Sequence, residues 1–126
     1  MNKQQKAYAI AKAAYETALH EQEAAEREYI EKNGIKNSDG TVPRRSYNID
    51  DEVAFDEAMK ALEQYEINRS NAFQTLIAAE DALIEYGLSI VPTGIAETLR
   101  GAKDNLKYRE KIIDLTFRLD AKTVKR

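Results

Sequence analysis

The feature that most constrains this chain is a long stretch near its start, residues 3–32, that contains neither proline nor glycine. The stretch is rich in Ala, Glu, Lys and Gln, which favour the helical conformation. At 3.6 residues per turn it predicts one α-helix of about eight turns. The pair Asn33 and Gly34 follows, and a glycine at this place supplies the left-handed conformation that ends many helices.

The apolar residues of this helix recur every three and four residues, which predicts that one side of it packs against another helix. Two seam positions alternate large and small side chains, with Tyr8, Tyr15, Gln22 and Tyr29 at one and Ala11, Ala18 and Ala25 at the other. We expect Ile10, Ala14 and Leu19 to widen the apolar stripe. The helix is therefore predicted to be amphipathic rather than buried on all sides.

Residues 34–49 have no helical period and contain Asp39, Gly40 and Pro43, so they predict a loop. A connection of this length exceeds most connections in a compact domain, which favours a functional or a mobile segment. A short strand at Thr41 and Val42, beside the Asp-Gly turn, is an alternative.

A second helix is expected over residues 50–86, with Asp50 or Asp51 as its N-cap and Gly87 as its stop. Its seam residues recur at spacings of three and four, interrupted only by Arg69: Ala58, Leu62, Tyr65, Arg69, Ala72, Leu76, Ala79, Leu83 and Tyr86. A helix of about 54 Å is unusual in so small a protein, so a break near residues 67–71 is an alternative to a continuous helix.

Pro92 cannot continue a helix, because it lacks an N–H group and disfavours helical geometry at the residue before it. We therefore expect a connector over residues 87–93 and a third helix over residues 94–121, with Thr93 as its cap. These elements predict an all-α fold of a single domain, residues 1–126. Its architecture is an antiparallel three-helix bundle, or an elongated helical hairpin with the third helix packed along it, and one long loop joins the first two helices.

The formal net charge is −3, but the charge is unevenly distributed. Residues 1–92 carry −7 and residues 93–126 carry +4. Packing of the acidic region against the basic helix is the favoured interpretation, and a nucleic-acid surface is the alternative. No apolar run is long enough to cross a membrane and no apolar signal segment begins the chain, so we expect a cytoplasmic protein without membrane association.

Several kinds of catalytic chemistry lack their residues in this chain. Cysteine is absent, which removes disulfides, thiolate metal sites and cysteine nucleophiles. His20, the single imidazole, lies four residues after Glu16, but one histidine cannot complete a di-iron site. There is no nucleophile elbow and no glycine-rich phosphate loop, and the paired carboxylates are typical of solvated helix faces. We therefore expect no catalytic site, no metal and no cofactor, so the chain is not predicted to be an enzyme.

Three surfaces are candidates for binding a partner. The first is the loop group Arg44, Arg45 and Tyr47, whose residue types are enriched at protein interfaces. The second, an alternative, is a basic ridge spaced by three and four residues on the third helix: Arg100, Lys103, Lys107 and Lys111. The third, also an alternative, is an acidic face on the first helix: Glu16, Glu21, Glu23, Glu28 and Glu31, with Glu26 in the same stretch.

These features favour a non-enzymatic protein-protein interaction module. A homodimer is one form of it, because helices that meet only pairwise leave apolar stripes uncovered. In size, acidity and lack of cysteine, the chain resembles small accessory proteins of phages and mobile elements that inhibit host defence nucleases, the anti-CRISPR proteins among them. The resemblance is one of style, and no motif carries it. The alternative function is a nucleic-acid-binding accessory protein that uses the basic third helix.

Overall fold

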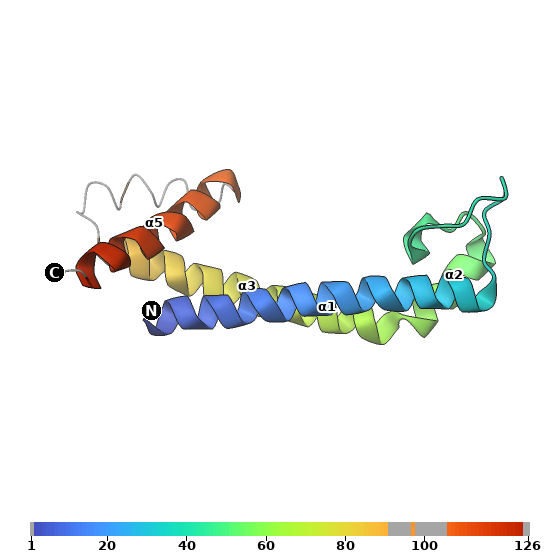
Figure 1. Ribbon diagram of the computed structural model, residues 1–126, viewed down its shortest axis with the longest axis horizontal. Helices are drawn as coiled ribbons and strands as arrows, with labels where there is room; N and C mark the ends of the chain where they lie inside the picture. The colour runs from blue at the N-terminus through green and yellow to red at the C-terminus, as the bar shows by residue number, and fades with distance from the viewer. Residues whose placement is uncertain (1, 91–96, 98–105, 125–126) are drawn as a thin grey trace. The chain divides into compact units, whose positions relative to one another are not determined.

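The computed structural model describes residues 2–90, 97 and 106–124, with the side chains of residues 109–118 in the last segment. Its elements are α1 (Lys3–Asn33), the 3₁₀ helix η1 (Ser46–Asn48), α2 (Glu52–Ala61), α3 (Glu63–Ile90) and α5 (Leu106–Val124) (Figure 1). No strand occurs among the described residues. The all-α prediction is confirmed, and the alternative strand at Thr41 and Val42 is wrong.

The contacts group the chain into two compact units, a finer division than the single domain expected from its length. Unit 1 comprises Met1–Lys12 with Gln74–Arg126, and unit 2 comprises Ala13–Phe73. Helices α1 and α3 contribute a segment to each unit, and within each unit these segments lie side by side (Figure 1). In unit 2, for example, the ring centroids of Tyr15 and Phe73 are 5.5 Å apart.

Helix α1 is closed at both ends by local hydrogen bonds. At its start the N–H of Gln5 donates to Asn2 Oδ1 over 2.8 Å and the N–H of Asn2 donates to Gln5 Oε1 over 3.0 Å, which forms a capping box. At its end Gly34 has a φ of 61°, and the N–H of Ile35 donates to the carbonyl of Ile30 over 3.1 Å. The predicted glycine stop is confirmed, because a residue without a Cβ adopts this geometry at little cost.

Most of the predicted seam of α1 is at least partly buried. Ala11 is buried, and partly covered positions follow it at Tyr15, Ala18, Leu19, Gln22, Ala25 and Tyr29. Ile10, by contrast, is 71% exposed and Ala14 is exposed, so the prediction of a wider stripe is wrong at these two positions. At 3.6 residues per turn Ile10 lies about 100° from Ala11 around the helix axis, and Ala14 lies about 60° from it, at the edge of the covered side.

The long second helix is broken, but not near residues 67–71, where the sequence offered a break as an alternative. It breaks at Leu62, which has a φ of −103° and a ψ of 4° and separates α2 from α3. The carbonyl of Leu62 accepts two N–H groups of the next turn, at 3.1 and 3.3 Å. Residues 67–71 stay helical because most of their side chains face solvent, where Asn68 accepts a 2.8 Å bond from Gln64 instead of competing for the backbone.

Helix α3 continues through Gly87, which the sequence predicts as its stop, and ends at Ile90. Gly87 is buried against Thr116 of α5, and the next residue, Leu88, is 3% exposed. Burial of a leucine contributes about 1.5–3 kcal/mol, which outweighs the penalty of about 1 kcal/mol for glycine inside a helix. The core of unit 1 consists of Leu83, Ile84, Leu88, Ile112 and Ile113, with Tyr8 and Phe117 packed against it.

Helix α5 runs in the same direction as α3, as Figure 1 shows. Arg109 near its start donates to Glu80 and Asp81, at 3.1 and 2.9 Å, and further along both helices Thr116 faces Gly87. From a short connector over residues 87–93 we expected the second and third helices to be antiparallel neighbours. Helix α3 ends at Ile90 and α5 begins at Leu106. This separation in sequence allows the two helices to run parallel.

Part of the predicted helix 94–121 lies outside the described residues, together with its cap at Thr93 and the connector beyond residue 90. The described part of this region comprises the helical residue 97 and α5, which extends to Val124. None of the described helices is both long enough and apolar enough to cross a membrane.

Candidate binding site

The loop between α1 and α2 is shaped by its own polar side chains. The N–H of Asn37 donates to the carbonyl of Thr41 over 2.8 Å, and Gly40, at a φ of 85°, allows the turn between them. Asp39 accepts bonds from the hydroxyl and the N–H of Thr41, at 2.6 and 2.9 Å. These two bonds stabilise the ionised carboxylate and lower the pKa of Asp39.

Two aspartates at the end of the loop have different roles. Asp51 is the N-cap of α2, because its Oδ1 accepts the N–H groups of Val53 and Ala54 at 2.9 and 3.1 Å. Asp50 instead reaches back to Ser38, whose hydroxyl and N–H donate to Oδ2 at 2.7 and 3.0 Å. The bonds from Ser38 lower the pKa of Asp50 from its ordinary 3.8. The loop is therefore tied together at both of its ends.

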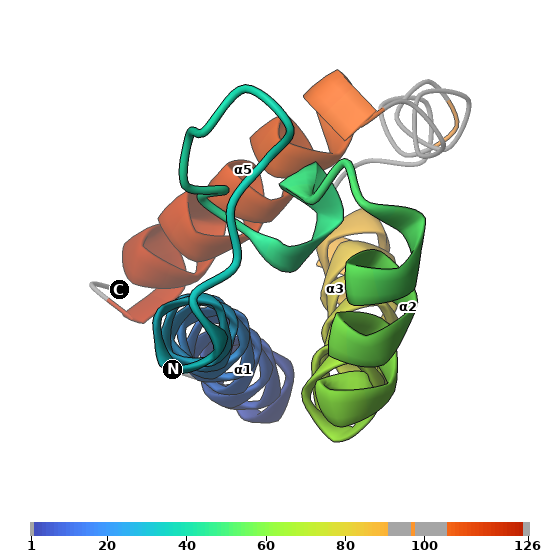
Figure 2. The same ribbon diagram turned by 90° about the vertical axis from the view of Figure 1, so that its right-hand side faces the viewer.

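A buried carboxylate anchors this loop to α1. Glu26 is 3% exposed, and its Oε2 accepts the N–H of Ser46 over 2.9 Å and the hydroxyl of the same residue over 3.1 Å. A carboxylate is costly to bury unless it is hydrogen-bonded, so the pair specifies where η1 lies on α1. Helix η1 also contacts α2, and Figure 2 shows it between α1 and α2.

Next to this anchor, Arg45 forms a more exposed cluster with Glu23 and Tyr47. Its Nη2 lies 3.1 Å from Glu23 Oε1, and its Nη1 donates to the hydroxyl of Tyr47 over 2.9 Å. The hydrogen bond to Tyr47, followed by the charges of Tyr47 and Glu23, raises the pKa of Arg45. The guanidinium carbon also lies 5.8 Å from the centre of the Tyr47 ring. The cluster thus orients Tyr47, although that side chain is 57% exposed.

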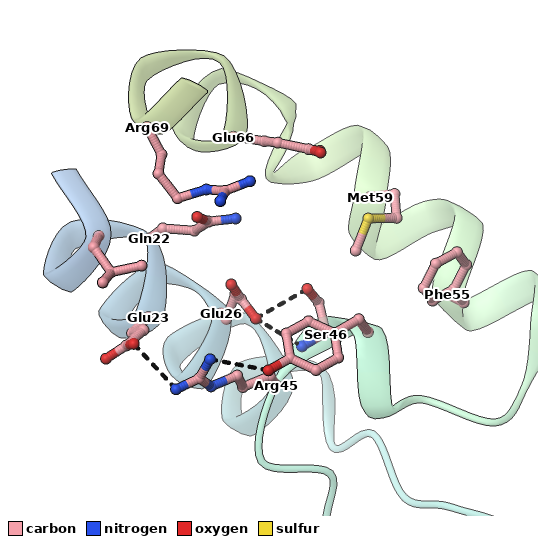
Figure 3. A pocket seen from close by; sticks show the side chains of 11 residues that line it. Gln22, Glu23, Glu26, Arg45, Ser46, Phe55, Met59, Glu66 and Arg69 are labelled. Carbon is pink, nitrogen blue, oxygen red and sulfur yellow. Dashed lines mark hydrogen bonds and ion pairs between the residues drawn. The ribbon is translucent and has the colours of Figure 1, made fainter. Parts of the chain in front are cut away.

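These residues form part of the lining of a hollow in unit 2 that has a volume of about 220 Å³ (Figure 3). Its charged lining comprises three carboxylates, Glu23, Glu26 and Glu66, and two guanidinium groups, Arg45 and Arg69. Its apolar lining includes Leu19 of α1 with Phe55 and Met59 of α2. The hollow therefore offers charge and apolar surface to the same ligand.

Arg69 differs from the other basic residue of the hollow. Its side chain extends from α3 toward Gln22 on α1 (Figure 3). Its Nε is buried and makes no hydrogen bond to the part of the chain that the structure describes. Arg45, by contrast, has Glu23 and Tyr47 as partners.

The three residues of the predicted loop group differ in their contacts. Arg45 and Tyr47 line the hollow and contact each other. Arg44 is exposed and has no hydrogen bond or ion pair within the described residues. That these three residues bind a partner stays a prediction, but Arg45 also holds the loop on α1.

The predicted acidic face is smaller than the sequence suggests. Glu16, Glu21, Glu28 and Glu31 are exposed on α1. Glu23 is engaged by Arg45, and Glu26 is buried beneath η1. Glu23 and Glu26 lie on another side of the helix from Glu21 and Glu28, whereas Glu16 shares the side of Glu23 but lies about two turns earlier in the helix.

Little of the predicted basic ridge can be placed. Lys111 is exposed on α5, and Lys107 is part of that helix. Arg100, Lys103 and the side chain of Lys107 lie outside the described residues. His20 is exposed on α1, and within the described residues no three histidine, aspartate or glutamate side chains are grouped as a metal site.

Arg69 was not among the residues singled out from the sequence as binding residues, and Glu26 was named only as one of the glutamates in the acidic stretch of α1. Arg69 had a signal, because it interrupts an otherwise uncharged seam of the second helix. Glu26 had none of its own, because its partner Ser46 is distant in sequence and α1 carries many other glutamates.

Comparison with known proteins gave no relative of this chain: no protein-family model, no curated protein and no solved structure matches it.

Proposed function

We propose that this chain is a non-enzymatic protein-interaction module, and that its partner binds at the loop over residues 34–51 and the adjoining hollow. The observation that carries the proposal is that the loop is held on α1 while Tyr47 and Val42 remain 57% and 58% exposed. An oriented aromatic side chain loses less conformational entropy on binding than a free one. Tyrosine and arginine are also enriched among the residues that dominate binding energies.

A narrower form of the proposal is that the partner is a host defence nuclease and that the chain inhibits it for a phage or mobile element. Its support is the exposed acidic residues of α1, Glu16, Glu21, Glu28 and Glu31, which suit a basic partner surface. Under this form, a nuclease recovered with the chain is inhibited by it, and charge-neutral variants at these four residues inhibit less at low salt.

The alternative function, nucleic-acid binding through the basic third helix, makes an opposite prediction about salt. Binding that is dominated by phosphate contacts weakens steeply between about 50 and 200 mM salt. We predict no measurable binding of DNA or RNA at physiological salt. A gel shift at low micromolar protein would favour the alternative.

The test of the interaction proposal is site-specific photo-crosslinking of the full chain in an extract of the cells that make it. A photoreactive amino acid replaces Tyr47 in one variant and Ile67 in the control. Ile67 is 43% exposed on α3 and does not line the hollow. We expect a discrete adduct from position 47 that position 67 does not give. Equal adducts at both positions, or none, would refute the proposal.

A second variant separates binding from folding. Arg44→Ala combined with Arg45→Ala is expected to reduce the adduct at position 47 while changing the melting temperature by less than about 2 °C, because exposed ion pairs contribute little to stability. A large fall in melting temperature would show that the pair is structural. If the adduct is between two copies of this chain, the partner is a second copy, which is the homodimer form of the proposal.

A further inference from the structure

The charged side chains that line the hollow differ in the hydrogen-bond and ion-pair partners that the chain provides for them. Glu26 accepts two hydrogen bonds from Ser46, and Glu23 pairs with Arg45 over 3.1 Å. The guanidinium of Arg69 has no hydrogen bond or ion pair within the described residues, and its Nε is buried. A buried donor without an acceptor is unfavourable, so an acceptor from outside the chain would be stabilised here.

The chemistry of this acceptor follows from the side chain that would bind it. A guanidinium group presents a planar fork of donors that matches a carboxylate or a phosphate. The hollow is also lined by three carboxylates, Glu23, Glu26 and Glu66, which repel a doubly charged phosphate more than a singly charged carboxylate. Of these two anions, the charge of the lining therefore favours a carboxylate over a phosphate.

The size and the apolar lining of the hollow limit the rest of the ligand. Its volume of about 220 Å³ is below the range of about 300–1,000 Å³ that is common for pockets of drug-sized ligands. It suits one side chain rather than a larger molecule. Leu19, Phe55 and Met59 supply apolar surface, and methionine adapts readily to an aromatic ring.

From these observations we infer that the hollow binds a carboxylate group next to an apolar side chain of a protein partner, with Arg69 as the residue that binds the carboxylate. The inference deepens the proposed function and rests on it for the statement that the ligand belongs to a protein. The carboxylate is either that of an acidic side chain or that of a chain terminus, and both present the same two oxygens to Arg69.

The experiment is a titration of the full-length, ¹⁵N-labelled protein followed by NMR, with three small probes. The first is N-acetyl-phenylalanine, which carries a terminal carboxylate. The second is the N-acetyl-phenylalanyl-glutamate peptide with an amidated end, which carries a side-chain carboxylate. The third is N-acetyl-phenylalanine amide, which has the same ring but no charge. Each is added up to about 20 mM, because a ligand of this size binds with a dissociation constant in the millimolar range.

We expect at least one of the two carboxylate probes to give saturable shifts of the Arg69 Nε–H signal and of the amides of Ser46 and Met59. Its affinity should exceed that of the amide probe by about fivefold or more, because a charged acceptor strengthens the bond to a guanidinium. Whichever carboxylate probe binds tighter identifies the source of the carboxylate. Equal affinity of acid and amide, or no saturable shift with any probe, would overturn the inference.

Variants at two arginines assign the effect to one residue. Arg69→Gln should abolish the preference for the acid, and Arg69→Lys should retain only part of it, because lysine keeps the charge but lacks the fork. Arg27→Gln is the matched control, because Arg27 is an exposed arginine of unit 2 that does not line the hollow. Each variant is first checked by circular dichroism for the helical spectrum of the parent. A preference for the acid that persists in a folded Arg69→Gln variant would overturn the inference.

The outcome can be separated from that of the proposed function. If the carboxylate probes bind and no adduct forms at position 47, the carboxylate site stands and the protein-interaction proposal falls. If an adduct forms but the probes do not bind, the partner uses the exposed loop and the inference about Arg69 is wrong.

Discussion

Gly87 of α3 lies so close to Thr116 of α5 that a Cβ added to the glycine would overlap the Oγ1 of the threonine. Thr116 is 1% exposed and its hydroxyl donates to the carbonyl of Ile112 over 2.9 Å, so it has little freedom to move aside. This contact sets how closely the two helices approach in the core of unit 1. It also explains why a glycine is present at a helical position where its intrinsic propensity is poor.

The first prediction concerns this contact. Gly87→Ala should lower the free energy of unfolding by about 1–2 kcal/mol, because overpacking outweighs the gain in helix propensity. Chemical denaturation monitored by circular dichroism measures the change. In a Thr116→Ala background, where the hydroxyl is gone, the same substitution should instead raise the free energy of unfolding by about 0.5–1 kcal/mol. A higher free energy of unfolding for Gly87→Ala in the parent chain would contradict the close contact between Gly87 and Thr116.

The second prediction concerns the ion pairs of Arg109 with Glu80 and Asp81. Burial lowers the pKa of Arg109, but the bonds to Asp81 and Glu80 outweigh it and raise the pKa overall. Arg109→Met should lower the free energy of unfolding by about 1–2 kcal/mol, less than for a fully buried network because Asp81 is half exposed. Arg118→Met, at an exposed position of the same helix, should change it by less than about 0.5 kcal/mol. Similar losses of unfolding free energy in Arg109→Met and Arg118→Met would show that the ion pairs of Arg109 do not cause the loss.

The third prediction concerns the buried anchor of the loop. Glu26→Ala should lower the free energy of unfolding by about 1–3 kcal/mol, because it leaves the buried N–H of Ser46 without its acceptor. Hydrogen exchange of the Ser46 amide should accelerate in this variant. Glu26→Gln keeps an acceptor and should have a smaller effect, while Glu28→Ala on the exposed side of α1 should leave the exchange unchanged. An unchanged exchange rate of the Ser46 amide in Glu26→Ala would show that Glu26 does not anchor the loop.

The fourth prediction concerns pH. The pKa of Asp50 is lowered by its bonds with Ser38, so the folded loop is stabilised at pH values above the ordinary pKa of 3.8. That stabilisation should be lost as the pH falls below 3.8 through the lowered pKa of the folded state. An NMR titration of the Asp50 carboxyl measures this pKa directly. Ser38→Ala should move it up toward 3.8, and an Asp50 pKa that does not respond to this substitution would refute the assigned cause.

The helices of this protein could be predicted because their signals are local. The Ala-rich stretch without breakers, the left-handed glycine at Gly34 and the carboxylate cap at Asp51 each depend on residues within one or two turns. Where the prediction failed, a tertiary contact had outweighed a local preference. Gly87 stays inside a helix because its neighbour Leu88 is buried in the core, and Leu62 rather than residues 67–71 marks the break.

The candidate site shows the same division. From the sequence alone we predicted that Arg45 and Tyr47 lie on a loop and that Arg69 interrupts a seam. The tertiary structure placed Ser46 on Glu26 and set Arg69 into the lining of the same hollow. The sequence determined the helices and the exposed charges, because propensities and caps act between near neighbours. Only the folded chain decided which carboxylate is buried and which guanidinium has no partner, because those properties depend on residues that are far apart in sequence.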